Sequence, residues 1–182
     1  MQKNKFFVPE EIMREQNEYK KKVKNIIKSK FQGEIPKAFV HTYGCQGNVA
    51  DSEHIKGQLV EMGYILTETL DEANIIIYNT CAIREHAEDR VFGNVGALKT
   101  LKKNNKNLVI GLCGCMMQQE HVAEKIKNSY PYVNLVFGTH ALHKLPELLF
   151  KVFKTKKRVF SIEKKDGVCY NVGKQYSNWR QL

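Results

Sequence analysis

Short apolar runs alternate with amphipathic stretches from Pro36 to about Glu163. Six runs predict β-strands, at 37–43, 64–68, 74–80, 107–114, 133–138 and 158–163. Several are rich in Val and Ile throughout, as expected of strands buried on both faces. The stretches between them carry apolar residues at helical spacing. This alternation predicts an α/β fold with a mainly parallel sheet of about five to six strands and helices on both faces.

A further helix is predicted over residues 9–31, ahead of the alternating pattern. Acidic residues begin it and lysines end it, the charge order that the helix dipole favours. Its apolar positions form a narrow stripe, which suits a helix that docks loosely or awaits a partner. We therefore expect an N-terminal helical extension (1–35), an α/β domain (36–155) and a last strand with a linker or tail (156–182).

Composition excludes several classes of protein. The chain has 182 residues, the size of one domain, with 42% apolar and 26% charged residues, as in soluble proteins. No apolar run approaches the roughly 20 residues of a membrane span. The N-terminus lacks an apolar block followed by a small-residue cleavage site. We expect a cytoplasmic protein without membrane attachment.

The net charge of +10 is unevenly distributed. Residues 1–36 carry +4, residues 37–150 carry −1 and residues 151–182 carry +7. Basic flanks suit a polyanion such as RNA, and they equally suit a solvated surface. The basic segment 99–106 is expected to mark a helix end and could contact phosphate.

Three of the five cysteines occupy equivalent places in this plan. Cys45 follows the first predicted strand, Cys81 the third and Cys115 the fourth. The carboxyl ends of parallel strands share one edge of a sheet, so these thiols are expected to converge there. Each also precedes a helical stretch, whose amide groups favour a thiolate. Gly44 and Gly114 would permit tight turns and close approach of a bulky ligand.

Three converging thiolates suit a 4Fe–4S cluster with one iron open to an exogenous ligand. Zinc could use the same three with a histidine such as His41 or His86. Alternatively, the thiols could simply fill the core at strand ends. Of the other two cysteines, Cys113 is expected to be buried in the sheet and Cys169 to be a bystander in the tail.

Two other groups of side chains are expected to be structural. His140 and His143 are spaced three residues apart at a predicted helix start, where capping or surface exposure is favoured over metal binding. Tyr43, Tyr78 and Arg84 are expected to pack near the cysteines, although such a cluster could also support a nucleobase.

The strings around the cysteines resemble a known family. HTYGCQGNVADSE, NTCAIREHAEDRVFGNVGALK and GLCGCMMQ are similar to the N-terminal domain of the radical SAM methylthiotransferases, and the resemblance covers residues 37–154. GCQ with NTCAIRE resembles the branch that modifies dimethylallyladenosine in tRNA. The ribosomal-protein branch tends to show GCPKN and the threonylcarbamoyladenosine branch GCKVN. Gly47 and Ala141 depart from the usual pattern without touching an expected ligand.

The resemblance implies that Cys45, Cys81 and Cys115 hold an auxiliary 4Fe–4S cluster. The full enzyme would carry a second 4Fe–4S cluster and S-adenosylmethionine (SAM). It would insert a methylthio group at C2 of the isopentenylated adenosine beside the tRNA anticodon. The CxxxCxxC motif of the radical SAM core and the RNA-binding domain are missing from this sequence. We therefore expect a fragment with no catalytic residue of its own, inactive when alone.

Three alternatives stay open. The chain could be a non-catalytic RNA-binding module, or a metal scaffold that binds another protein through its N-terminal helix. It could also belong to the threonylcarbamoyladenosine or the ribosomal-protein branch of the same family.

Overall fold

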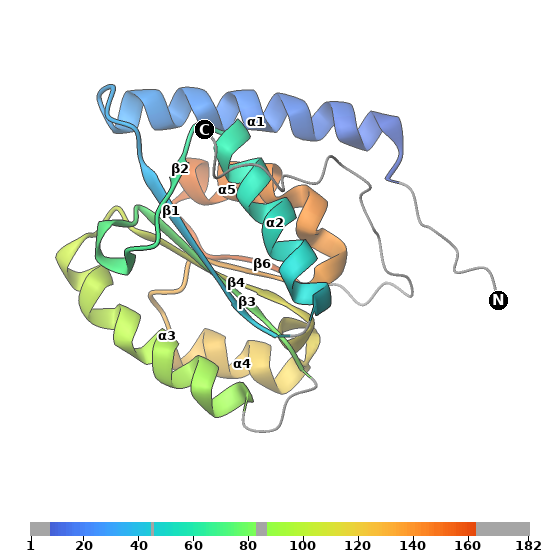
Figure 1. Cartoon of the computed structure of the whole chain (residues 1–182), viewed down its shortest axis with the longest axis vertical. Helices are drawn as coiled ribbons and strands as arrows, with labels where there is room; N and C mark the ends of the chain where they lie inside the picture. Colours follow the sequence, from blue (N-terminus) through green and yellow to red (C-terminus); the bar gives the residue numbers. More distant parts are fainter. Residues whose placement is uncertain (1–7, 45, 83–86, 163–182) are drawn as a thin grey trace.

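The computed structural model describes residues 8–44, 46–82 and 87–162, in which strands and helices alternate (Figure 1). The strands are β1 (Lys37–Tyr43), β2 (Ile65–Leu66), β3 (Ile75–Thr80), β4 (Val109–Gly114), β5 (Leu135–Phe137) and β6 (Val159–Ser161). The α-helices are α1 (Glu10–Lys30), α2 (Gln46–Glu61), α3 (Ala87–Asn104), α4 (Glu120–Ser129) and α5 (Leu145–Thr155). Each strand lies inside a run predicted from the sequence, and the predicted α/β class is confirmed.

The six strands form one parallel sheet in the order β2-β1-β3-β4-β5-β6. All residues of β3 and β4 are buried, which explains why these two runs contain no charged side chain. The register pairs Tyr43 with Thr80, and Thr80 with Gly114. These are the last residues of β1, β3 and β4, so three neighbouring strands end in one row.

Helices cover both faces of the sheet, as predicted (Figure 1). Apolar side chains of α1, α2 and α5 form a core with one face, centred on residues such as Ile55, Leu149 and Phe137. Those of α3 and α4 form a second core on the other face, with Val95, Ile110 and Ile126 among its members. Within the part of the chain that the structure describes, no helix has the length and apolar character of a membrane span.

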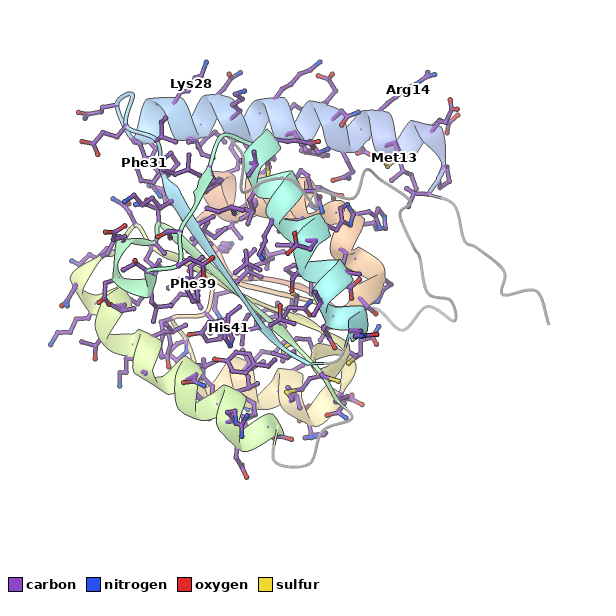
Figure 2. All side chains as sticks on the ribbon, in the orientation of Figure 1. Met13, Arg14, Lys28, Phe31, Phe39 and His41 are labelled. Carbon is purple, nitrogen blue, oxygen red and sulfur yellow. The ribbon has the colours of Figure 1, made fainter. Side chains whose placement is uncertain are left out.

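The N-terminal helix α1 is docked firmly, which corrects the expectation of loose attachment. Val23 and Ile27 are almost fully buried against the core of α2 and α5. Gln16 Nε2 donates a hydrogen bond to the Glu147 carboxylate of α5, 3.3 Å away. Arg14 and Lys28 extend from the outer side of the helix (Figure 2). The narrow apolar stripe is sufficient because only one edge of the helix contacts the domain.

The helix before β6 begins later than its apolar repeat suggests. The sequence places Leu142, Leu145, Leu149 and Val152 at helical spacing, but residues Thr139–Lys144 form a 3₁₀ helix and α5 begins at Leu145. Pro146 lies in the first turn of α5, where its missing N–H costs no helical hydrogen bond.

Candidate functional site

The predicted cysteine ligands follow the three aligned strand ends. Cys81 comes directly after Thr80, the last residue of β3, and Cys115 comes directly after Gly114, the last residue of β4. Neighbouring strands lie about 4.8 Å apart, so the register alone brings these two residues together. Cys45 lies outside the described residues; in the sequence it stands between Gly44, just beyond β1, and Gln46, which begins α2.

The Cys81 and Cys115 thiols interact with each other. Burial and the neighbouring Cys81 thiol raise the pKa of Cys115, against the effect of a hydrogen bond that the Ala82 N–H donates to Cys115 Sγ over 3.1 Å. The Cys115 thiol in turn donates to the Thr80 carbonyl, 3.6 Å away. Cys81 is buried and Cys115 is half-buried. The Cys115 thiol is therefore held beside Cys81, and its raised pKa favours the neutral form of Cys115 in the free protein.

The amide that reaches Cys115 comes from a different element than expected. Cys115 itself begins a short 3₁₀ helix (Cys115–Gln118), and α3 begins only at Ala87, six residues after Cys81. The donor is Ala82, the residue directly after Cys81. The amides of Ala82 and of Cys115 itself lower the pKa of Cys115, but burial outweighs them and the net shift is upward, so the expected stabilisation of a Cys115 thiolate is not reached in the free protein.

Cys113 lies in the core, as predicted. It is fully buried on β4 against the face covered by α2 and α5. Burial, and to a lesser degree the Asp51 carboxylate, raise its pKa well above the ordinary value. A neutral thiol with no exposure behaves as a small apolar side chain. Cys169 lies outside the described residues.

A buried polar network beneath the strand ends was not predicted from the sequence. Asn79 Nδ2 donates to the Asn48 carbonyl at 2.8 Å and to Ser52 Oγ at 3.0 Å, and Asn48 Nδ2 donates to the Thr80 carbonyl at 3.2 Å. Ser52 Oγ is also hydrogen-bonded to Thr42 Oγ1 at 2.7 Å. The available signal was an amide in the otherwise apolar run of β3, since buried polar groups need partners. The network ties the first turns of α2 to β1 and β3.

Gly114 allows β4 to end against β3. Its φ is 104°, and a Cβ there would lie 2.1 Å from the Thr80 carbonyl oxygen. We expected this glycine to make room for a ligand, but its close approach is to protein backbone. The residue is needed so that Cys115 can turn out of the strand beside Cys81.

The two histidines after β5 differ from each other. His140 Nδ1 is hydrogen-bonded to Gln118 Nε2 at 3.1 Å. His143 is buried rather than exposed, which corrects the sequence-based expectation for it. Burial lowers its pKa to about 4, with smaller contributions from Lys144, His54 and His140, and a small opposing one from Glu147.

The aromatic side chains near β1 pack together, as expected. The rings of Tyr43 and Tyr78 meet edge to face with centroids 5.2 Å apart, and the His41 ring contacts Tyr43 at 4.5 Å. Arg84, the third member of the predicted cluster, and His86 lie outside the described residues. Among the described residues, no three Cys, His, Asp or Glu side chains are arranged to hold a metal ion. Cys45 is not among the described residues.

Comparison with known proteins gives two consistent results. The profile of Uncharacterized protein family UPF0004 matches residues 37–138. Curated relatives carry the name tRNA-2-methylthio-N(6)-dimethylallyladenosine synthase. The protein of Caldicellulosiruptor saccharolyticus is 53% identical over 127 residues, 70% of this chain and 27% of the relative. That of Clostridium perfringens (strain 13 / Type A) is 52% identical over 130 residues, 71% and 29%.

The protein of Bacillus subtilis is 47% identical over 135 residues, which are 74% of this chain and 26% of the relative. The chain thus spans less than a third of the length of these relatives. The profile match covers more than half of this chain, from the first residue of β1 to the end of β5, and includes all three predicted cysteine ligands. The chain therefore belongs to the UPF0004 family.

Proposed function

We propose that this chain is the cluster-binding part of a tRNA methylthiotransferase that acts on dimethylallyladenosine. The names of the relatives support this reaction, and the matched region supports its assignment to one portion of a longer enzyme. In this proposal residues 36–155 are the cluster-binding domain, residues 1–35 are a helical extension, and residues 156–182 lead to a radical SAM core. That core would hold SAM and a second 4Fe–4S cluster. The enzyme would act in the cytoplasm on the isopentenylated adenosine beside the anticodon.

The observation that carries the proposal is the contact between the Cys81 and Cys115 thiols at aligned strand ends. With Cys45, which follows the third aligned end, they would supply three thiolates to an auxiliary 4Fe–4S cluster with one open iron. The donor set fits, because iron–sulfur clusters are held by cysteine thiolates. The amide of Ala82 is already hydrogen-bonded to Cys115 Sγ, as is common for thiolates that bind clusters.

Such a cluster would supply the sulfur of the methylthio group. The residues of this chain would hold and position it. The amide network of Asn48 and Asn79 fixes the start of α2 against β3, and so fixes the backbone on either side of Cys45 relative to Cys81. Because burial raises the pKa of Cys115, loading must release a proton there and is favoured as pH rises.

The test is anaerobic reconstitution followed by quantitation of iron and sulfide. The wild-type chain is compared with the Cys45→Ala, Cys81→Ala and Cys115→Ala single variants. We expect about four irons and four sulfides per chain, with visible absorption, and loss of both in each variant. Cys113→Ala is the matched control, because this thiol is two residues from Cys115 but buried in the core. It should load like the wild type.

Two results would contradict the assignment. Equally poor loading of the wild type and the three variants would make the strand-end thiols core residues and leave RNA binding as the alternative function. One zinc per chain with no sulfide would favour a zinc scaffold. For the reaction itself, Cys81→Ala in the full-length enzyme should abolish methylthiolation of tRNA, and retained activity would refute the sulfur-delivery role.

A further inference from the structure

A basic cavity lies at the opposite edge of the sheet from the cysteines. It has a volume of about 810 Å³ and is lined by the ends of α1, α3 and α5 and by the amino ends of β4 and β5. Four lysines surround it and no carboxylate does, among the described residues. These lysines are Lys30, Lys102, Lys106 and Lys156.

The lysines are close enough to repel each other. Burial, and then the charge of Lys156, lower the pKa of Lys30. Burial, and then the charge of Lys30, lower that of Lys102. An anion in the cavity would relieve this repulsion, because the cavity lining itself offers no negative side chain.

The helix dipoles offset only part of the positive charge of the four lysines. Three helices end at the cavity, and each C-terminus carries about half a negative charge, so together they offset about 1.5 of the four positive charges. Lys102 is also held by groups outside these helices, since Lys102 Nζ donates to the carbonyls of Lys106 and Leu108, which follow α3, and to Asn134 Oδ1. Lys30, Lys106 and Lys156 leave a net positive surplus at the rim.

The remainder of the lining matches a nucleotide unit. The apolar floor includes Ile26, Val152 and Phe153, and Lys30 Nζ lies 5.2 Å from the centroid of the Phe153 ring. Amide side chains such as Asn25 and Asn107 lie at the rim. The volume exceeds that of a single phosphate and falls within the range of small-ligand pockets. An aromatic face beside cations is a common way of holding a base and its phosphate.

We propose that this cavity binds a phosphate of an RNA strand, with the attached nucleoside over its apolar floor. The inference rests on the proposed tRNA function and adds a second contact to it. β4 connects the cavity, at Val109, to the cysteine edge, at Gly114, over roughly 17 Å. The cavity would therefore hold a phosphate distant from the nucleotide that reacts.

The test measures binding of an unmodified anticodon stem–loop RNA to the full chain. The variant Lys30→Gln/Lys156→Asn removes two rim charges, and Asn suits the left-handed conformation of residue 156, whose φ is 55°. The control Lys21→Gln/Lys125→Gln removes the same charge from exposed positions that do not line the cavity. We expect about tenfold weaker binding for the cavity variant and less than about twofold for the control. The slope of log K against log salt should fall by about 0.7, because one phosphate contact is lost.

Equal weakening by the two double variants, or no weakening by the cavity variant, would overturn the proposal. Equally tight, cavity-dependent binding of polyglutamate would also overturn it, in favour of an acidic protein partner. A second cavity variant, Lys106→Gln/Lys156→Asn, leaves the contacts of Lys30 intact. If the weaker RNA binding comes from lost charge and not from misfolding, this variant must also bind RNA more weakly. Thermal melts check that all variants are folded.

The last part of the test asks whether free anions bind in the cavity. Inorganic phosphate and AMP are tested alone and as competitors of the RNA. Competition that the cavity variant abolishes supports a phosphate site, and AMP competing better than phosphate supports a contribution from the floor. The Cys45/Cys81/Cys115 triple alanine variant should bind RNA normally. If the chain loads iron but does not bind RNA through the cavity, only this inference is refuted. If it binds RNA through the cavity but does not load iron, only the cluster assignment is refuted.

Discussion

Single residues at the ends of β1, β3 and β4 divide the work of building the site. Cys81 and Cys115 supply thiols, Asn79 supplies a buried amide that organises α2, and Gly114 permits the backbone to turn. None of these could be exchanged for a similar side chain without loss, because each fits a different constraint. The two thiols must reach the proposed cluster, and the buried amide of Asn79 must have hydrogen-bond partners. The positive φ of residue 114 favours glycine.

Gly114→Ala should destabilise the protein by at least about 2 kcal/mol. The methyl group would meet the Thr80 carbonyl oxygen at 2.1 Å, in a backbone conformation that alanine rarely adopts. Denaturant unfolding measures the change. Gly93→Ala is the control: this glycine lies on α3, and a Cβ added there would meet nothing within 4 Å, so alanine should stabilise by about 0.5–1 kcal/mol. Equal effects of the two substitutions would contradict the prediction.

His143 should make stability depend on pH. Its pKa falls from 6.5 to about 4 on folding, so the unfolded chain binds more protons between these values. The contribution of His143 to the free energy of unfolding is therefore complete above about pH 6.5 and is lost as pH falls toward 4. Asp51, whose pKa burial raises to about 6, gives the opposite slope in the same region.

The effect of His143 is therefore measured as a difference in the free energy of unfolding between two proteins. The free energy of unfolding of wild type is compared with that of His143→Gln at several pH values. The wild type should lose stability relative to the variant as pH falls from 7 to about 4. A difference that stays constant over this range would show that His143 titrates alike in both states.

At the scale of elements, α1 shows how a weakly apolar helix becomes part of the domain. Its buried positions include Val23 and Ile27, and the ion pair between Lys20 and Glu61 joins it to α2. Nine of its 21 side chains are charged and exposed. The helix thus adds lysines to the molecular surface while closing the core above α5.

Ile27→Ala should cost about 2–4 kcal/mol, because the side chain is almost fully buried and its loss leaves a cavity. Chemical denaturation followed by circular dichroism gives the value. Ile35→Ala, which truncates an isoleucine that is 61% exposed, should change stability by less than about 0.5 kcal/mol. If Ile27→Ala proves equally mild, α1 does not contribute to the cooperative core.

At the scale of the whole molecule, the parallel sheet separates two edges of different chemistry. The carboxyl edge collects thiols and a buried amide network, and the amino edge collects lysines around a cavity. The strand direction produces this separation, because every β–α connection crosses from one edge to the other. An RNA that reached both edges would be held at two points.

Binding of a cluster at the carboxyl edge should stabilise the entire domain, since its ligands would come from the ends of three adjacent strands. At a free ligand excess of about 100-fold over Kd the gain is about 2.7 kcal/mol, or roughly 5–10 °C in Tm for a chain of this size. Anaerobic melts before and after treatment with an iron chelator measure it. The Cys81→Ala variant should melt at the same temperature with and without the chelator. A chelator effect of equal size in that variant would contradict the prediction.

The alternation of apolar runs and helical repeats was enough to predict the six strands, the parallel sheet and the edge at which Cys81 and Cys115 meet. This succeeded because strand direction follows from the β–α alternation, and direction alone sets which residues share an edge. The docking of α1, the burial of His143, the partners of Asn48 and Asn79 and the lysine cavity were decided by the tertiary structure. Each depends on which segments distant in sequence pack together, and local patterns of polarity do not specify those contacts.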